Sequence, residues 1–320
     1  MKLIFMGTPD FAVGTLEALV QAGHEIVLAV TQPDKPQGRK QVLVAPPVKE
    51  KALELGIPVF QPKRVREPDS LRVLKDYEPE LIVVAAFGQI LPKELLDLPK
   101  YGCINVHASL LPKYRGAAPI QWSILNGDDV TGVTIMRMDV GLDTGDMIAK
   151  TEVKIAPEDT GGTLFDRLAE AGARLCVETI PSIVDGTAVY TPQDESAATK
   201  VGMIKKQDGR IDFLRSAKAI ECQVRGLNPW PSAYTFIAGK TLKIWSAEVC
   251  EDATVIDGGP ASGTASAAPG TVVFTKKDCF GIQTGDGILV CKEVQLEGKK
   301  RMSAGDFLRG NAIEVGTILG

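Results

Sequence analysis

The chain has 320 residues, of which 44% are hydrophobic and 24% charged, and its formal net charge is −4. This length exceeds the roughly 100–200 residues of one typical domain, so two domains are expected. No apolar run approaches the roughly 18 residues of a membrane span, and the six cysteines include no C-x-x-C pair, so no membrane, zinc or disulfide framework is indicated. The first apolar run is too short for the core of a signal peptide, which predicts a cytoplasmic protein.

Short apolar runs alternate with helical patterns up to about residue 189, as in a parallel sheet with crossover helices. The expected strands are Lys2–Met6, Glu25–Thr31, Val59–Phe60, Leu81–Phe87, Cys103–His107, Thr131–Met138 and Met147–Ile155. The expected helices are Phe11–Ala22, Val48–Leu55, Asp69–Asp76, Ala118–Asn126 and Leu164–Val184. The run Leu81–Phe87 does not alternate with polar residues, so it should be a central strand buried on both faces. Residues 1–189 are therefore predicted to form a doubly wound, Rossmann-like α/β catalytic domain.

The pattern changes after Gly186. Residues 190–204 are polar and punctuated by proline, which indicates a linker. Residues 205–320 contain short β-rich segments separated by glycine-containing turns, typical of a small closed or partly closed β barrel. The expected strands there are Tyr234–Ile237, Leu242–Val249, Gly270–Phe274, Gly281–Thr284 and Gly287–Gln295. The low-complexity stretch Gly258–Gly270 is expected to be a loop rather than a site.

One of the two histidines lies where a site is expected. His24 follows a glycine that ends a helix, so it is expected to be a solvated turn residue. His107 ends a buried strand, and Asn105, two residues earlier, points to the same side. Ligands of open α/β sheets bind beyond the carboxyl ends of the strands. An isolated Asn-x-His can equally be a pair that ties down a loop, so the surrounding sequence has to decide.

Two flanking segments supply that context. The run from Ala108 to Trp122 reads ASLLPKYRGAAPIQW, and the run from Met138 to Asp146 reads MDVGLDTGD. The second is a glycine-punctuated loop between two strands that could bring a carboxylate to the imidazole. Asp143 by itself could also be an ordinary turn residue, because aspartate beside glycine usually is.

Together these segments resemble the 10-formyltetrahydrofolate-dependent formyltransferase family. The matching motifs are the Asn-x-His at 105–107, the Ser-Leu-Leu-Pro run at 109–112 and the Asp-x-Gly-x-Asp-Thr-Gly loop at 139–145. The opening FMGTPDF and the run YRG, followed by Pro119 and Trp122, resemble the tRNA-directed branch. The resemblance covers essentially the whole chain and implies a C-terminal domain of the oligonucleotide-binding (OB-like) type.

The resemblance implies that the chain moves a formyl group from 10-formyltetrahydrofolate to the amino group of methionyl initiator tRNA, without a metal. Asn105, His107 and Asp143 are the expected catalytic residues. An asparagine amide can donate to the developing oxyanion, while a carboxylate near the imidazole favours its charged form and fixes its orientation. The family's folate-contacting run corresponds to Ser109, Leu110, Leu111 and Pro112, although core packing explains the two leucines equally well. Further candidates for the pterin slot are Phe87, Gly88, Gln89, Ile90, Asp139 and Gly141.

Two basic regions are candidates for tRNA binding. The segment 31–47 is long for a connection between a strand and a helix; it carries Lys35, Arg39 and Lys40, which are expected at the acceptor stem. Residues 199–249 hold nine basic against four acidic residues, a surplus of five positive charges. Three of them, Lys205, Lys206 and Arg210, are expected to follow the tRNA backbone. The chain is expected to act as a monomer.

Three other functions are considered. A formyltransferase acting on a small nucleotide or amino-sugar nucleotide would use the same three residues, but it would not need a second domain that begins with a positive stretch. A nicotinamide-dependent dehydrogenase is disfavoured because the segment Gly7–Ala12 lacks G-x-G-x-x-G. A non-catalytic RNA-binding module is disfavoured because all three catalytic residues are present.

Overall fold

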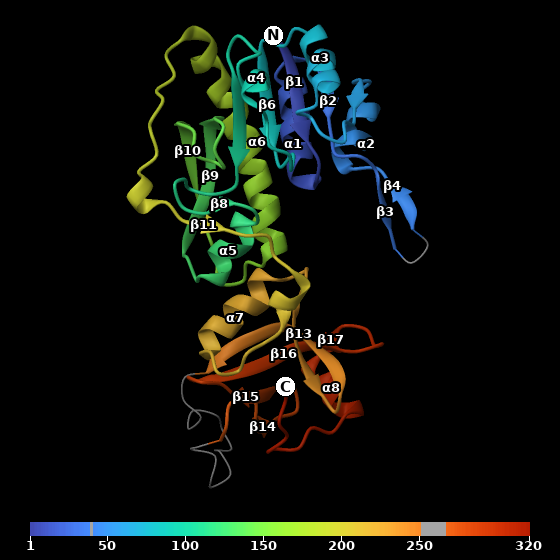
Figure 1. Ribbon diagram of the computed structural model, residues 1–320. Coiled ribbons are helices and arrows are strands. Elements are labelled where there is room, and N and C mark those ends of the chain that lie inside the picture. Colours follow the sequence, from blue (N-terminus) through green and yellow to red (C-terminus); the bar gives the residue numbers. More distant parts are fainter. Residues whose placement is uncertain (39–40, 251–266) are drawn as a thin grey trace. The chain divides into compact units, whose positions relative to one another are not determined.

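A computed structural model describes residues 1–38, 41–250 and 267–320 of the chain (Figure 1). It divides into two compact units. The N-terminal unit comprises Met1–Pro119, Val130–Lys154 and Phe165–Gly202, and the C-terminal unit comprises Ile120–Asp129, Ile155–Leu164 and Met203–Gly320. The expected domain limits after residues 189 and 204 stay predictions.

The N-terminal unit is built on a seven-stranded sheet in the order β10-β9-β7-β6-β1-β2-β5. Its strands are β1 (Lys2–Gly7), β2 (Glu25–Val30), β5 (Val59–Phe60), β6 (Leu81–Ala85), β7 (Cys103–His107), β9 (Val130–Arg137) and β10 (Met147–Lys154). Neighbours from β5 to β7 pair in parallel, whereas β9 and β10 are antiparallel additions at one edge. As predicted, β6 is buried along its whole length between β1 and β7.

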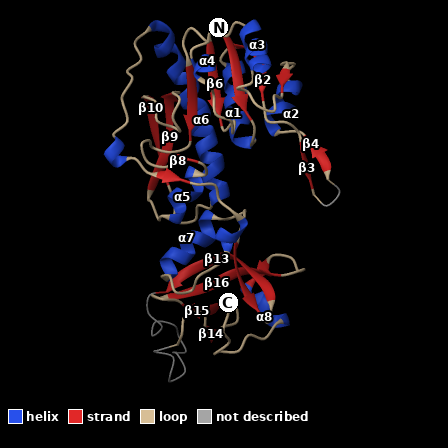
Figure 2. Cartoon of the chain, in the orientation of Figure 1, coloured by secondary structure: helices blue, strands red, loops and turns tan. Residues whose placement is uncertain are grey.

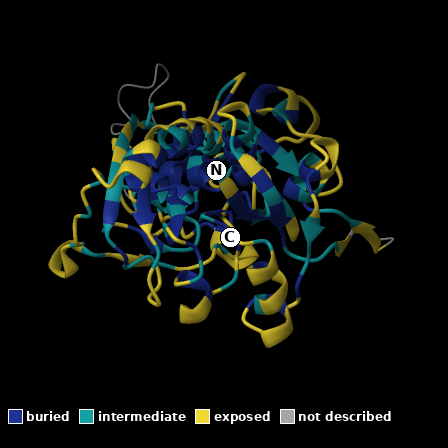
Figure 3. Ribbon diagram, turned by 90° about the horizontal axis from the view of Figure 1, so that it is seen from above, coloured by how far each residue is buried: buried dark blue, intermediate teal, exposed yellow. Residues whose placement is uncertain are grey.

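Helices cover both faces of this sheet (Figure 2), which confirms the Rossmann-like fold. They are α1 (Asp10–Gln21), α2 (Pro47–Glu54), α3 (Pro68–Asp76), α4 (Lys93–Leu96) and α6 (Gly161–Asp185). On one face, β1 and β6 pack with α3 and α4 in a single apolar cluster. On the other face, Phe11 of α1 and Phe165 of α6 meet edge to face with ring centroids 5.6 Å apart. Figure 3 shows buried residues both in the strands and on parts of the helices.

The segments expected to be a loop (residues 31–47) and a linker (residues 190–204) contain short strands and a 3₁₀ turn. A hairpin, β3 (Lys35–Gln37) and β4 (Val42–Val44), occupies the long connection after β2. Strand β8 (Arg115–Gly116) pairs in parallel with β11 (Lys200–Val201), so the chain that leads to the C-terminal unit first binds the N-terminal one. A 3₁₀ turn, Glu195–Ala197, precedes β11.

The C-terminal unit is an antiparallel β domain. Its sheet order is β12-β13-β16-β15-β14, with β17 on β16. The strands are β12 (Ala233–Ile237), β13 (Lys240–Cys250), β14 (Val272–Thr275), β15 (Phe280–Gln283), β16 (Ile288–Leu296) and β17 (Met302–Ser303). Its helices are α5 (Pro119–Leu125), a 3₁₀ turn (Lys206–Gly209), α7 (Ala217–Gly226) and α8 (Ala304–Gly310).

The chain's last residues connect the two outer strands of this sheet. The Val272 N–H of β14 donates to the Thr317 carbonyl over 2.8 Å, and the Gly320 N–H donates to the Phe236 carbonyl of β12 over 3.1 Å. A large cluster of buried apolar side chains inside this unit includes Phe213, Phe280 and Phe307. The expected β-rich C-terminal domain is confirmed. Most of the low-complexity stretch Gly258–Gly270 lies outside the described residues.

Within the described ranges, no helix is long and apolar enough to cross a membrane. None of the six cysteines, all of which lie in the described ranges, forms a disulfide. Burial raises the pKa of Cys103 and of Cys176 to about 12, so neither thiol is a nucleophile near neutral pH.

Candidate active site

Strand β7 places Asn105 and His107 on one side of the sheet. Asn105 lies between Val84 of β6 and Met136 of β9. It is half-buried, and its side-chain amide makes no hydrogen bond with another residue in the described part of the chain. Two N–H donors are therefore available at a rigid position in the middle of the sheet.

His107 is held by a hydrogen bond at one ring nitrogen and faces a carboxylate with the other. It is 6% exposed, and its Nε2 lies 3.0 Å from the Tyr114 carbonyl oxygen. Since a carbonyl only accepts, Nε2 carries the hydrogen of this bond. The other nitrogen, Nδ1, lies 3.7 Å from Oδ1 of Asp143. Nδ1 is thus the nitrogen that can exchange a proton, and it does so beside a carboxylate.

Asp143 is oriented by the chain segment that also holds His107. Its Oδ2 accepts the Gly116 N–H over 2.8 Å, two residues after the Tyr114 carbonyl. Its φ of 54° lies in the left-handed region, which is uncommon for non-glycine residues and which aspartate adopts more often than most. Asp139 stabilises the same loop, because its Oδ1 accepts the Gly141 N–H over 3.0 Å and the Thr144 hydroxyl over 2.7 Å.

A segment distant in the sequence makes hydrogen bonds with the Asp143 loop, with the chain that follows this loop and with the segment that holds His107. We call residues 191–201 the strap. At its start, Thr191 and Met147 exchange backbone hydrogen bonds of 2.9 Å. At its end, the Arg115 N–H donates to the Thr199 carbonyl over 2.8 Å, and the Tyr114 N–H donates to the Thr199 hydroxyl over 2.8 Å. The strap therefore fixes the segment that orients both His107 and Asp143.

The strongest side-chain contact of the strap is made by Arg115, which is only 1% exposed. Its guanidinium donates to both carboxylate oxygens of Glu195, over 3.0 and 2.7 Å. Its Nε donates to Oε1 of Gln193 over 2.9 Å. Hydrogen bonds from Arg115 lower the pKa of Glu195, and those to Glu195 raise the pKa of Arg115. The pair is a bidentate one, which fixes geometry as well as charge.

Acidification is expected to release this pair. Because the pKa of Glu195 in the folded chain lies below its ordinary value of 4.5, the pair stabilises the fold fully above that value. The contribution is lost as the pH falls through the lowered folded value. Since the Glu195 side chain is 73% exposed, solvent screens the pair and the effect is modest. Thermal unfolding of wild type and Glu195→Gln should therefore show a gap in midpoint at pH 7 that closes in acid. A gap independent of pH would contradict this account.

The residues expected to contact folate are partly committed to internal contacts. Ser109 is fully buried, and its hydroxyl donates to the Lys113 carbonyl over 2.6 Å. Leu111 is 1% exposed and packs with Met136 and Met147. Leu110 lies over Gly132 of β9, where a Cβ would come within 2.6 Å of the leucine side chain. Pro112 is half-buried, and its carbonyl accepts the Thr199 N–H over 3.2 Å. Their role toward folate stays a prediction.

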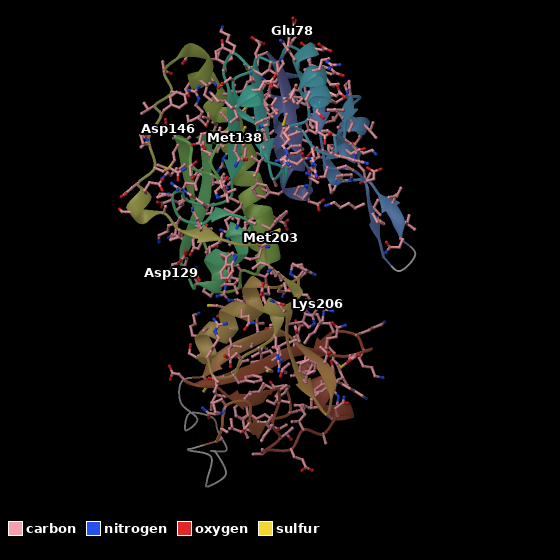
Figure 4. The ribbon with its side chains drawn as sticks, viewed as in Figure 1. Glu78, Asp129, Met138, Asp146, Met203 and Lys206 are labelled. Atoms are coloured by element: carbon pink, nitrogen blue, oxygen red, sulfur yellow. The ribbon has the colours of Figure 1, made fainter. Side chains whose placement is uncertain are left out.

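The loop after β6 also contains some residues that are engaged in contacts within the protein and one that is exposed. Phe87 is 2% exposed and belongs to the apolar cluster under the sheet, together with Met138, labelled in Figure 4. The Gln89 amide accepts the Val65 N–H over 2.7 Å and donates to the Pro62 carbonyl over 3.3 Å. Gly88 has a φ of 82°, and Ile90 is 74% exposed. Ile90 is thus the residue of this loop with an apolar side chain free to meet a ligand.

The basic candidates are exposed where they are described. Lys35 lies on the β3–β4 hairpin of the N-terminal unit. Lys205, Lys206 and Arg210 lie at the beginning of the C-terminal unit, where Figure 4 labels Met203 and Lys206. The Arg210 guanidinium stacks 5.8 Å from the Phe236 ring centroid. Arg39 and Lys40 lie outside the described residues.

Sequence reasoning missed Arg115, Gln193 and Thr199. Arg115 stood in the YRG run, but only as a mark of resemblance, and the other two were assigned to a polar linker. A buried arginine paired with residues about 80 positions away leaves no local periodicity that would reveal it. Among the described residues there is no group of three or more His, Cys, Asp or Glu placed to hold a metal.

Comparison with known proteins assigns this site to a family. The formyl transferase family model matches residues 1–180, and the model of the formyl transferase C-terminal domain matches residues 203–312. The chain belongs to the formyl transferase family. The resemblance drawn from the motifs is therefore confirmed.

Full-length relatives within the family share one name. A methionyl-tRNA formyltransferase of Agathobacter rectalis is 56% identical over 318 residues, covering 99% of both chains. A methionyl-tRNA formyltransferase of Bacillus subtilis is 50% identical over 320 residues, covering 100% of this chain and 98% of its own. These relatives confirm the predicted enzyme class and function and leave the small-acceptor alternative less supported.

The fold also occurs in a solved sugar enzyme. An N-formyltransferase from Helicobacter canadensis, in complex with folinic acid and dTDP-3-aminofucose, superposes with a TM-score of 0.65 at 19% identity. It covers 94% of this chain and 100% of its own. At this identity the likeness shows the fold alone. Because the likeness extends over nearly the whole chain, the presence of a C-terminal domain does not by itself separate a tRNA acceptor from a small one.

Proposed function

We propose that this chain transfers the formyl group of 10-formyltetrahydrofolate to the α-amino group of methionyl initiator tRNA, in the cytoplasm and as a monomer. The observation that carries the proposal is the His107–Asp143 pair beside the uncommitted Asn105 amide, in a chain about 50% identical to full-length methionyl-tRNA formyltransferases. Membership in the family and a folate-bound structural neighbour support a folate-derived formyl donor.

The reaction exchanges one amide bond for another. The neutral amine attacks the formyl carbon and forms a C–N bond, negative charge develops on the formyl oxygen, and the bond from the formyl carbon to N10 of the folate then breaks. The amine loses one proton, and N10 gains one. The products are N-formylmethionyl-tRNA and tetrahydrofolate. The protein therefore has to stabilise an oxyanion and move a proton.

Asn105 suits the first of these tasks. Its amide is neutral, anchored in the sheet between β6 and β9, and free to donate. A fixed donor aimed at a developing oxyanion typically contributes about 2.7–4 kcal/mol to transition-state stabilisation. A side chain on a central strand keeps its position better than one on a loop, so little reorganisation is needed during the reaction.

The His107–Asp143 pair suits the second task. Since Nε2 is engaged by the Tyr114 carbonyl, proton exchange takes place at Nδ1, on the side of the Asp143 carboxylate. Protonation there creates an ion pair in a site from which solvent is largely excluded, because the two side chains are 7% and 14% exposed. In our proposal Asp143 accepts the proton leaving the amine, directly or through a water. His107 stabilises the negative charge that develops on the formyl oxygen.

The folate ring needs a flat apolar surface with a few polar atoms at its edge. Ile90, Val140 and Leu142 are 74, 68 and 59% exposed and lie in the two loops that we assign to the donor. The Asp139–Gly145 loop is held in shape by its own hydrogen bonds, so it can present backbone groups without rearranging. These residues fit a pterin ring and supply no group that would hold a metal in its place.

Exposed basic residues support a polyanionic acceptor. Lys35 on the hairpin and the group Lys205, Lys206 and Arg210 are exposed and can neutralise phosphates. Arg39 and Lys40 are proposed for the same role from the sequence alone. A small sugar nucleotide would need few of these charges, which is a second reason to prefer tRNA.

The test is formyl incorporation into methionine-charged initiator tRNA with 10-formyltetrahydrofolate as donor. Glycinamide ribonucleotide and an amino-sugar nucleotide serve as competing acceptors in parallel reactions. Transfer to the charged tRNA alone is expected. Transfer confined to a small acceptor would keep the catalytic roles and overturn the acceptor, together with the functions given to the basic residues.

A further inference from the structure

Gln193 joins three parts of the site through one side chain. Its Nε2 donates to the Asp143 carbonyl and to the Gly145 carbonyl, each over 2.8 Å. Its Oε1 accepts from Nε of the buried Arg115 over 2.9 Å. All of its side-chain hydrogen-bonding atoms are thus used, and both donors end on the loop that carries Asp143.

The contacts of Gln193 act on a conformation that needs support. Asp143 has a φ of 54°, in the left-handed region, which costs free energy for a residue with a side chain even though aspartate adopts it more readily than most. The carboxylate has to face the Gly116 N–H on one side and His107 on the other. The two carbonyls bonded by Gln193 flank the Asp143–Gly145 turn, and fixing them fixes the direction in which the carboxylate leaves the backbone.

The other end of Gln193 is itself anchored. Arg115 is 1% exposed and is bonded to Glu195, which leaves its guanidinium little freedom. Arg115 also lies between Tyr114 and Gly116, whose backbone groups bond His107 and Asp143. Gln193 therefore joins the segment that holds the imidazole to the loop that holds the carboxylate.

We infer that Gln193 is a positioning residue for formyl transfer. By holding the Asp143 and Gly145 carbonyls, it keeps the Asp143 carboxylate oriented toward His107. The inference rests on the proposed function. It assigns to the strap a part in the chemistry, although no strap residue touches the reacting atoms in this scheme.

The first variant is Gln193→Met, which keeps the length of the side chain and removes its donors. We expect kcat to fall about tenfold or more, since small displacements of catalytic groups have large effects on rate. The KM values for charged tRNA and for the folate donor should stay within about twofold, because Gln193 contacts neither in this scheme. A second variant, Gln193→Glu, keeps the acceptor for Arg115 and removes the donors, and should lose as much.

The matched control is Asp194→Ala. This neighbour is exposed, and its carboxylate accepts bonds from the N–H and hydroxyl of Ser196 within the strap. Its kcat should stay within about twofold of wild type. Thermal unfolding of all variants separates loss of fold from loss of position.

A double-mutant cycle with Asp143→Asn gives the decisive readout. If Gln193 acts through the Asp143 carboxylate, Gln193→Met should slow the Asp143→Asn enzyme by less than about twofold. The same fold-loss in both backgrounds would overturn the inference, and so would wild-type kcat in either Gln193 variant. Failure of the proposed function shows itself differently, as a wild-type enzyme without activity on charged tRNA.

Discussion

Replacing Asn105 or His107 with alanine is expected to slow formylation of charged tRNA by at least about a hundredfold, while tRNA affinity stays within a few fold. Asn105→Ala removes the one uncommitted amide at the carboxyl end of β7, and with it the proposed donor to the oxyanion. His107→Ala removes the nitrogen that faces Asp143 at 3.7 Å. The measurements are single-turnover formylation and equilibrium tRNA binding.

Two further variants make this prediction sharper. His107→Gln offers an amide that can still donate to the Tyr114 carbonyl but cannot exchange a proton, so it should be nearly as slow as alanine. Asn311→Ala is the control for the loss of an asparagine amide, since that side chain donates to the Phe307 carbonyl in the C-terminal unit. A parallel fall of rate and tRNA affinity in the β7 variants would make the two residues structural.

Gly145→Ala is expected to lower the rate by an amount on the order of a hundredfold, although no side chain that does chemistry is changed. A Cβ at Gly145 would stand 1.8 Å from the Arg137 carbonyl oxygen, a backbone atom that cannot swing away. The loop has to shift, and Asp143 shifts with it. The Gly145 carbonyl also loses its bond with Gln193.

The control for Gly145→Ala is Gly14→Ala in helix α1. The nearest atom to a Cβ there is the Ala173 Cβ at 4.0 Å, which is ordinary contact. Removing a helical glycine typically stabilises a protein by about 0.4–1 kcal/mol. Gly14→Ala should therefore be as active as wild type and at least as stable. If Gly145→Ala turned over at the wild-type rate, the loop's shape would not matter to the chemistry.

Local periodicity predicted much of the fold. The seven apolar residues from Leu81 to Phe87 indicated a central strand, and β6 is the fully buried centre of its sheet. The strand Cys103–His107 has the predicted limits, and the five strands predicted for the C-terminal domain lie within a few residues of β12 to β16, while β17 was not predicted. These segments were predictable because burial on one or both faces leaves a period of two or an unbroken apolar run.

Other features of the fold depend on distant contacts. Nothing in the residues of β9 states that it runs antiparallel to β7, or in those of β10 that it runs antiparallel to β9, because a strand's direction is set by the connection before it. The hairpin β3–β4 lies in a segment rich in proline and charge, where strand patterns are weak. Helix α7 was not predicted at all. It begins at the Ser216 cap, whose hydroxyl accepts the Ala219 N–H.

In the candidate site, too, some residues were predictable from the local sequence and others depend on distant contacts. The alternation of strand side chains placed Asn105 and His107 together from the sequence. Asp143 came from a motif, and its place near His107 follows from hydrogen bonds to Gly116 and Gln193 that no single segment encodes. Gln193 lies 50 residues from Asp143, in a stretch with the composition of a linker.

The strap changes what counts as a minimal catalytic fragment. A fragment that ends at residue 180, where the match to the formyl transferase model stops, retains every residue assigned here to the reacting atoms. It lacks Gln193, Glu195 and β11, so Arg115 would lose its carboxylate partner and the Asp143 loop would lose its donors. In a chimera that exchanges the C-terminal unit for another acceptor-binding module, the junction therefore belongs after Gly202, and a swap made earlier in the chain would alter the chemistry along with the specificity.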